Sequence, residues 1–150
     1  MHLRDFLADD AIELHLNSTT AEDVLVELVN IFHLDEKSTA TLLKIVRRRE
    51  ELGSTGVGRG IAIPHGRSPV VNSLRVAFGR TQTGIPYRAI DDKPVHYFFL
   101  IVAPPVEVSN QYLPVLGRIA QLAKEPDVPE RLAGLTTREE FFQLLEEKGV

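Results

Sequence analysis

One histidine stands where its side chain could act as a nucleophile. The segment Leu52 to Arg67 reads LGSTGVGRGIAIPHGR: hydroxyl residues and three alternating glycines lead into the apolar run Ile61 to Ile63, and Pro64 ends that run before His65. Pro64 fixes its own φ and favours an extended conformation in the preceding residue. Gly66 then permits backbone conformations that other residues resist. We therefore expect the imidazole of His65 to be displayed at the exit of a short buried strand.

The residues around His65 could support phosphoryl transfer. A neutral imidazole is a competent nucleophile toward phosphorus near pH 7, because its unperturbed pKa is about 6.5. The reaction also needs donors for the equatorial phosphoryl oxygens, and backbone N–H groups, hydroxyls and guanidinium groups are suitable. The chain offers candidates of each kind, namely Arg49, Ser54, Thr55, Gly56, Arg59 and Arg67. Without these neighbouring donors, a histidine in such a turn would more often have only a structural role at the end of a strand.

Arg49 is the arginine that we expect to turn toward His65. It closes the run Arg47-Arg48-Arg49, of which at least one member should lie on a solvated helix face. Arg49 is nearest to the end of the predicted helix and to the glycine-rich segment, so it is the best placed of the three.

Other chemistries find little support. Gly56 and Gly58 lack the third glycine of a dinucleotide fingerprint and precede a strand instead of following one, and no GK[ST] sequence follows. The five histidines are far apart and lack the spacing of metal ligands. The chain has no cysteine, which excludes thiolate catalysis, and no G-x-S-x-G elbow. We expect neither a metal nor a nucleotide cofactor.

The bulk composition is that of a globular protein. With 150 residues, 43% hydrophobic and 25% charged, the chain is most simply one domain spanning residues 1–150. A net charge of −4 gives no reason to expect nucleic-acid binding. The N-terminal residues lack the pattern of a signal peptide, and the longest apolar run, Tyr97 to Ala103, is too short to span a bilayer. We therefore expect a cytoplasmic protein without membrane insertion.

Hydrophobic periodicity predicts a strand, two helices, three strands and then further helices. Strands are indicated at 12–16, 61–63, 74–81 and 94–103, and helices near 20–33, 36–52, 109–124, 129–133 and 138–148. Turn-forming residues fill 84–86 and 90–94. The nearly continuous apolar sequence of 94–103 is typical of a central strand covered on both faces. The order predicts an α/β fold, a three-layer α/β/α sandwich whose mixed central sheet is flanked by helices on both faces.

Arg49-Glu50 followed by GSTGVGRGIAIPHG resembles the active-site region of a known family, the enzyme IIA domains of the bacterial phosphoenolpyruvate-dependent phosphotransferase system. The resemblance extends over nearly the whole chain, including the turn Ile90 to Val95 and the apolar strand that ends at Ala103-Pro104. It is strongest for the fructose/mannitol class. The GST start and the length of the chain favour the nitrogen-regulatory branch of that class.

The resemblance implies a phosphoryl carrier that acts as a histidine phosphotransferase. His65 would be phosphorylated by the phosphocarrier protein HPr or its nitrogen-branch counterpart, and Arg49 would match the arginine beside it. The phosphoryl group would then pass to a cysteine of an enzyme IIB, or its presence would determine which regulatory target is bound. No cofactor is implied.

Two positions depart from the pattern of the family. Tyr112, in the pair Tyr112-Leu113, stands where many relatives have a second histidine; we predict that Tyr112 lies near His65, where its hydroxyl could donate one hydrogen bond to a phosphoryl oxygen. Arg59 stands where relatives often have asparagine, and its charge could either bind phosphate or face an acidic partner.

The sequence leaves alternatives to the carrier hypothesis. In one, the chain is a regulatory binding module in which phosphorylation of His65 is only a switch that adds charge; in another, the domain binds partners without accepting phosphate. An unrelated activity on an α/β domain is a third. The sugar, the regulatory target and the oligomeric state stay open, as does the reacting ring nitrogen. If a backbone carbonyl held Nδ1–H, Nε2 would be the nucleophile.

Overall fold

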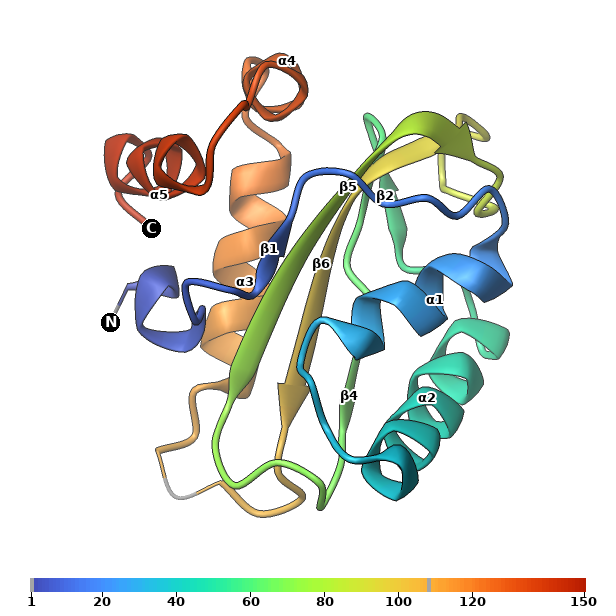
Figure 1. Cartoon of the computed structure of the whole chain (residues 1–150). Coiled ribbons are helices and arrows are strands. Elements are labelled where there is room, and N and C mark those ends of the chain that lie inside the picture. The colour runs from blue at the N-terminus through green and yellow to red at the C-terminus, as the bar shows by residue number, and fades with distance from the viewer. Residues whose placement is uncertain (1, 108) are drawn as a thin grey trace.

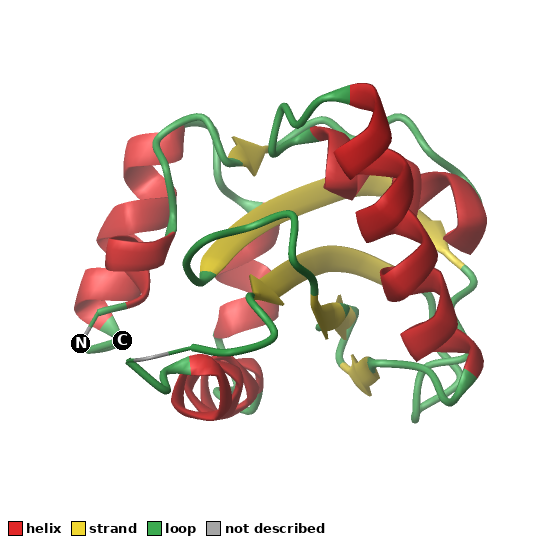
Figure 2. Ribbon diagram, turned by 90° about the horizontal axis from the view of Figure 1, so that it is seen from below, coloured by secondary structure: helices red, strands yellow, loops and turns green. Residues whose placement is uncertain are grey.

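Helices cover both faces of one mixed β-sheet in the computed structural model, which describes residues 2–107 and 109–150 (Figure 1). Figure 2 shows the strands lying between the helices, so the predicted α/β/α sandwich is confirmed. In chain order the elements are η1 (Leu3–Phe6), β1 (Ile12–Glu13), α1 (Ala21–Asn30), α2 (Glu36–Glu51), β2 (Gly56–Gly58), β3 (Ile61–Ala62), β4 (His65–Arg67), β5 (Arg75–Ile85), β6 (Val95–Ala103), α3 (Tyr112–Ala123), α4 (Val128–Ala133) and α5 (Arg138–Glu147).

The segment that carries His65 follows one edge of the central strand β6. The sheet has the order β1-β5-β6-β3-β2, and β4 also pairs with β6. β5 is antiparallel to β6, whereas β3 and β4 are both parallel to it and lie one after the other along its far edge. Ile61 is opposite Tyr97, and His65 is opposite Ile101. Pro64 therefore occupies the short interval between two strands that share one partner.

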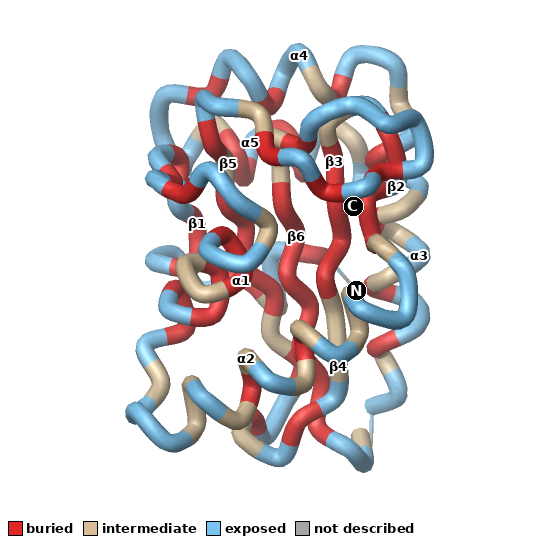
Figure 3. The backbone as a smooth tube through the Cα atoms, turned by 90° about the vertical axis from the view of Figure 1, so that its right-hand side faces the viewer, coloured by how far each residue is buried: buried red, intermediate tan, exposed pale blue. Residues whose placement is uncertain are grey.

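Strand β6 is the centre of the hydrophobic core, and Figure 3 shows its tube as almost continuously buried. Phe99 projects into an aromatic cluster with Phe78 and Phe141, whose ring centroids lie 5.0 Å apart for Phe78–Phe99 and 4.5 Å apart for Phe78–Phe141. Burying one such side chain stabilises the fold by roughly 1.5–3 kcal/mol. A strand covered on both faces in this way is a rigid support for the residues paired along its edge.

Side-chain caps fix the starts of several helices. The Thr20 hydroxyl accepts the Asp23 N–H at 3.1 Å at the start of α1. A capping box of Thr137 and Glu140 is present at the start of α5. Helix α1 contacts β5 and α2 contacts β4, whereas α3 contacts β6, so the two helical layers are held by different strands.

Some sequence predictions of element boundaries are wrong. Strand β5 continues to Ile85, because its hairpin with β6 resumes there opposite Val95, so Gly84 and Ile85 belong to a strand and not to a turn. Only Ile12–Glu13 of the first predicted strand pairs in the sheet. Helix α3 begins at Tyr112 and not near residue 109, and Leu113 is 68% exposed. The buried face of that helix is formed by Tyr112, Val115, Ile119 and Leu122.

The glycine-rich segment is also more ordered than a loop, since residues 56–58 form β2 and pair with β3. A Cβ atom built on Gly56 would lie 2.7 Å from the Ala89 Cβ and 2.8 Å from the Ala89 Cα. Because the second of these is a backbone atom, the neighbouring segment cannot yield by a rotamer change. Gly56 thus permits a close approach of two backbones.

We expect Gly56→Ala to destabilise the fold by about 1–3 kcal/mol, the usual cost of overpacking. The matched control is Gly117→Ala, since Gly117 lies in α3 and no atom comes within 4 Å of a Cβ placed there. That change should be neutral or stabilising by up to about 1 kcal/mol. Urea unfolding of the three proteins measures both effects, and equal midpoints for the two variants would contradict the assigned clash.

Candidate active site

Backbone pairing on both sides fixes the position of His65. The Pro64 carbonyl accepts the Ile101 N–H at 3.0 Å, and the Ile63 N–H donates to the Thr55 carbonyl at 3.0 Å. The sequence predicts that the strand ends at Pro64. In the structure a further short strand, β4, begins at His65 and pairs with β6. The histidine is displayed at a break between two short strands, half-buried and anchored to the most buried strand of the sheet.

The orientation of the His65 ring follows from one hydrogen bond. Nδ1 lies 2.7 Å from the Ile63 carbonyl oxygen. A carbonyl can only accept, so Nδ1 carries the proton and the neutral ring has its lone pair on Nε2. Burial lowers the pKa of His65, and the charge of Arg49 lowers it further, while the Ile63 hydrogen bond and Glu50 act in the opposite direction. The ring is therefore neutral at neutral pH, as a nucleophile requires.

Tyr112 and Arg67 lie beside the histidine. The rings of His65 and Tyr112 have centroids 6.2 Å apart, which confirms the predicted proximity. The Arg67 guanidinium carbon is 4.4 Å from the centre of the Tyr112 ring, and Nη1 of Arg67 donates to the Pro104 carbonyl at 3.1 Å. Burial raises the pKa of Tyr112, so its hydroxyl keeps its proton and is available as a hydrogen-bond donor.

Arg49 is the member of the arginine run that faces the site. Its charge lowers the pKa of both His65 and Tyr112, which places the guanidinium within electrostatic reach of both. Its Nη1 donates to the Gly53 carbonyl at 2.8 Å at the end of α2. Arg47 instead forms an ion pair with Glu22 at 2.5 Å, and Arg48 is exposed.

Ser54, Thr55 and Gly56 use their polar groups to hold the loop between α2 and β2. The Ser54 hydroxyl donates to the Tyr87 carbonyl at 2.6 Å and accepts the Gly56 N–H at 3.0 Å. Both the N–H and the hydroxyl of Thr55 donate to the carboxylate of Glu50. These donors are engaged within the protein, which favours a supporting role over direct contact with a phosphoryl group.

Glu50 is a residue of the site that sequence reasoning did not single out as functional. Its carboxylate holds Thr55, whose carbonyl accepts the Ile63 N–H, and the carbonyl of Ile63 in turn orients His65. Burial, together with the nearby Glu50 charge, raises the pKa of Tyr87. The signal available in the sequence was its place next to Arg49, at the end of the same helix.

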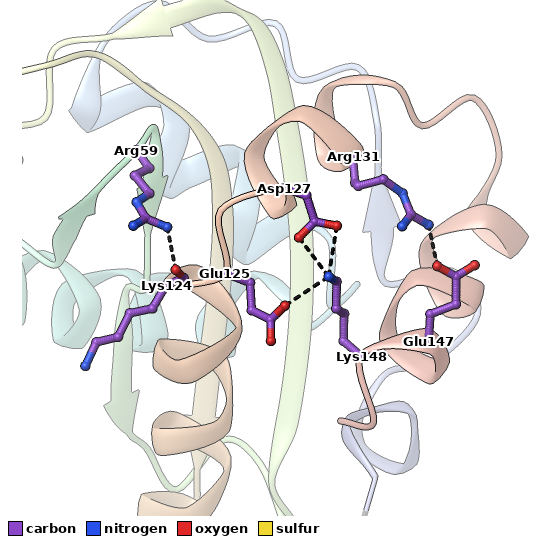
Figure 4. Close-up of polar contacts among 7 residues, drawn as sticks. All are labelled: Arg59, Lys124, Glu125, Asp127, Arg131, Glu147 and Lys148. Carbon is purple, nitrogen blue, oxygen red and sulfur yellow. Dashed lines mark hydrogen bonds and ion pairs between the residues drawn. The ribbon is translucent and has the colours of Figure 1, made fainter.

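The structure does not bring Arg59 to His65. The Nη1 of Arg59 donates to the Lys124 carbonyl at 2.5 Å, just beyond the end of α3 (Figure 4). Tyr112, which lies beside His65, is the first residue of the same helix. A helix of this length spans about 18 Å. The Arg59 N–H is also bound, by the Asp91 carboxylate at 2.9 Å. This placement argues against the expected contact of Arg59 with the phosphoryl group, because proximity in sequence is lost where the chain extends along β6.

Within the described ranges 2–107 and 109–150, no cluster of three or more His, Asp or Glu side chains could hold a metal ion. None of the helices in that part of the chain has the length and hydropathy of a membrane-spanning segment.

Comparison with known proteins identifies the family of the chain. The family described as the phosphoenolpyruvate-dependent sugar phosphotransferase system, EIIA 2, matches residues 5–148. A nitrogen regulatory protein of Bradyrhizobium diazoefficiens is 30% identical over 146 residues, which are 97% of this chain and 95% of that protein. A fructose-specific EIIA component of Haloferax volcanii is 32% identical over 128 residues, covering 85% of this chain and 81% of that protein. The chain spans only 23% of the fructose-specific EIIABC component of Bacillus subtilis, to which it is 28% identical over 147 residues.

Solved structures show the same similarity. The nitrogen regulatory protein IIA-Ntr of Neisseria meningitidis superposes with a TM-score of 0.85 at 29% identity, covering 94% of this chain and 97% of that chain. The mannitol IIA of Escherichia coli shares the fold, with a TM-score of 0.72 at 23% identity, over 92% of this chain and 97% of that chain. Since the family match includes nearly every residue from η1 to α5, the chain belongs to the EIIA 2 family of the phosphoenolpyruvate-dependent sugar phosphotransferase system.

Proposed function

We propose that this chain is a cytoplasmic phosphoryl carrier that accepts a phosphoryl group on Nε2 of His65. The observation that carries the proposal is the hydrogen bond from Nδ1 to the Ile63 carbonyl, because it leaves the lone pair of the neutral ring on Nε2. Family membership supports the same chemistry. No metal or nucleotide is needed for it.

The transfer itself is a displacement at phosphorus. The Nε2 lone pair attacks the phosphoryl group that an HPr-like phosphocarrier holds on its own histidine; a new P–N bond forms as the bond to the donor breaks, and the donor ring leaves with the electron pair. In the second step a cysteine thiolate of an enzyme IIB attacks, and the P–Nε2 bond breaks. His65 returns to its neutral form with Nδ1–H still bonded to Ile63, so each transfer begins from the same ring orientation.

The cations beside His65 would stabilise the charge of the transferred group. Arg49 reaches the ring electrostatically, and Arg67 is held over Tyr112. Fixed positive groups stabilise phosphoryl oxygens without reorganising during the reaction. The Tyr112 hydroxyl would add one hydrogen bond but no charge, so Arg49 and Arg67 would supply the charge that a second histidine gives in relatives. The exposed side chain of Leu113, next to Tyr112, is suited to contact a docked partner.

A second candidate function is regulation through the same phosphohistidine. It is favoured by the similarity to proteins named nitrogen regulatory protein, one of which matches this chain over nearly its full length. Under this hypothesis the added negative charge changes the affinity for a target protein. Both functions require His65 to accept phosphate, and they differ only in whether the phosphoryl group is passed on or retained as a signal.

Incubation with phosphoenolpyruvate, enzyme I and HPr should add one phosphoryl group to the protein. Intact-protein mass at alkaline pH measures it, because phosphohistidine is labile to acid. His65→Ala should gain no mass, whereas the control His15→Ala should behave like the parent, since His15 is exposed and lies on the first segment of the chain. A parent protein that stays unmodified, with both HPr and its nitrogen-branch counterpart shown to be phosphorylated, would contradict the proposal.

Two substitutions at the end of α2 should move the pKa of His65 in opposite directions. Arg49→Gln removes a charge that lowers this pKa and should raise it; Glu50→Gln removes a charge that raises it and should lower it. The exposed neighbours Arg48→Gln and Glu51→Gln are matched controls and should leave it nearly unchanged. NMR titration of the His65 imidazole measures all four. Shifts of equal size in the controls would show that long-range charge alone, and not the geometry of the site, acts on the ring.

Arg49 and Arg59 should differ in their effect on phosphorylation. We expect Arg49→Gln to slow phosphorylation by HPr about a hundredfold, the typical cost of removing one stabilising donor. Arg59→Gln should change the rate less than about threefold, because its guanidinium is bound to the Lys124 carbonyl at the far end of α3. Single-turnover transfer from phosphorylated HPr gives both rates. A large loss for Arg59→Gln with an intact fold would restore Arg59 to the site.

A further inference from the structure

A cavity of about 480 Å³ with a mixed polar and apolar lining opens at the end of the sheet away from His65, and the phosphoryl-transfer site does not use it. It is lined by Leu14 to Asn17 of the first segment, by Arg80 to Gln82 of β5, by His96 and Tyr97 of β6, and by Ala133 of α4. Tyr97 is paired four residues before Ile101, the partner of His65. At about 3.3 Å per residue this separates the cavity from the histidine by roughly 13 Å.

An irregularity of the β5–β6 hairpin forms this cavity. The regular pairing ends at Arg80 opposite Tyr97 and resumes only at Ile85 opposite Val95. Thr81 folds back locally, its hydroxyl donating to the Thr83 carbonyl at 3.0 Å. Such irregularities redirect side chains and often border functional sites. Here the last regularly paired residue, Arg80, and the first two residues of the unpaired stretch, Thr81 and Gln82, line the cavity.

Arg80 gives the cavity a positive charge that no carboxylate balances. Its Nε donates to the Leu14 carbonyl at 3.2 Å, and its Nη1 to the carbonyls of Leu132, Ala133 and Leu135 at 2.6–3.2 Å. These four acceptors are neutral. The ion pairs of the described residues do not include Arg80, and no Asp or Glu lines the cavity. Three of these acceptors lie at the C-terminal end of α4 and carry only partial negative charge, so the guanidinium keeps its full capacity for a charge-assisted hydrogen bond to an anion.

The guanidinium is also fixed before any ligand arrives. Four hydrogen bonds, one to Leu14 and three to residues 132–135, hold it, which reduces the conformational entropy that a ligand would otherwise have to order. Nη2 is the nitrogen that these bonds leave for a ligand. The amide groups of Asn17 and Gln82 add donors at the exposed rim.

His96 contributes a hydrogen-bond acceptor to the lining, in contrast to the donors of Arg80, Asn17 and Gln82. Its Nδ1 lies 3.1 Å from the Thr81 carbonyl oxygen, so the proton of the neutral ring is on Nδ1 and Nε2 is an acceptor. His96 and Arg80 line the same cavity, and a lining with both an acceptor and a cation suits a ligand that carries a hydroxyl as well as a negative group. We propose that this cavity binds a small hydroxylated anion, a phosphate monoester of a polyol or a hydroxy acid, with its negative group on Arg80. A volume of this size is within the range of small-molecule sites.

Amide chemical-shift titration of the whole chain tests the proposal. The probes are glucose 6-phosphate, citrate, inorganic phosphate and uncharged glucose. We expect glucose 6-phosphate or citrate to shift the resonances of Arg80, Gln82 and Tyr97 with a Kd of about 1 mM or tighter. Whichever of the two binds identifies the negative group as phosphate or carboxylate. Glucose should cause no shift, and inorganic phosphate should bind more weakly than the preferred probe.

Gln82→Glu is the decisive variant, because it places a carboxylate on the rim by an isosteric change of an exposed side chain. It should weaken binding at least about tenfold through like-charge repulsion. Gln121→Glu on α3 makes the same change of net charge outside the cavity and should leave binding unchanged. The proposal is overturned if no probe shifts these resonances at about 10 mM, ten times the expected Kd. Shifts confined to the surroundings of His65, or equal losses in the two variants, would overturn it as well.

Discussion

The hydrogen bond from Nδ1 of His65 to the Ile63 carbonyl is the interaction on which the site depends. It selects the tautomer and the ring orientation together, and it works only if the carbonyl two residues earlier is itself fixed. Ile63 is fixed because its N–H donates to Thr55, which Glu50 anchors to the end of α2. Pro64 completes the arrangement: its carbonyl accepts from Ile101 of β6, while its ring leaves no N–H to satisfy in the gap between β3 and β4.

The remainder of the fold can be understood as support for that short segment. Residues 61–67 have few pairing partners of their own, and a strand pair of two or three residues is unstable alone. They gain stability by lying against β6, whose residues Phe98 to Ala103 are buried on both faces. Helix α2 covers β4 from one side, and the start of α3 brings Tyr112 beside it. A reactive side chain can therefore be exposed while its backbone belongs to the most rigid part of the molecule.

Much of this could be predicted from the sequence, where local rules and tertiary packing agree. The apolar run of β6, the capped helices and the break at Pro64 are local signals, and each appears in the structure. Three features were not predictable because they depend on pairing between distant segments: β2 and β4 as strands, the continuation of β5 to Ile85, and the role of Glu50.

The positions of the arginines follow from the extended path of the chain along the edge of β6. Residues that are close in sequence are carried far apart by this path, and residues that are distant in sequence come to lie side by side. Arg59 is close to His65 along the chain, but the extended path from β2 to β4 carries it to the far end of α3. Tyr112 is distant along the chain and lies beside the histidine, because α3 begins near the end of β6 to which β4 is paired. The arginine side chains are distributed between the same two ends of the sheet. The charges of Arg49 and Arg67 lie on the side of His65, whereas Arg80 of β5 is bound to backbone carbonyls at the opposite end. One buried strand thus supports two polar regions about 13 Å apart, one at each end of its paired edge.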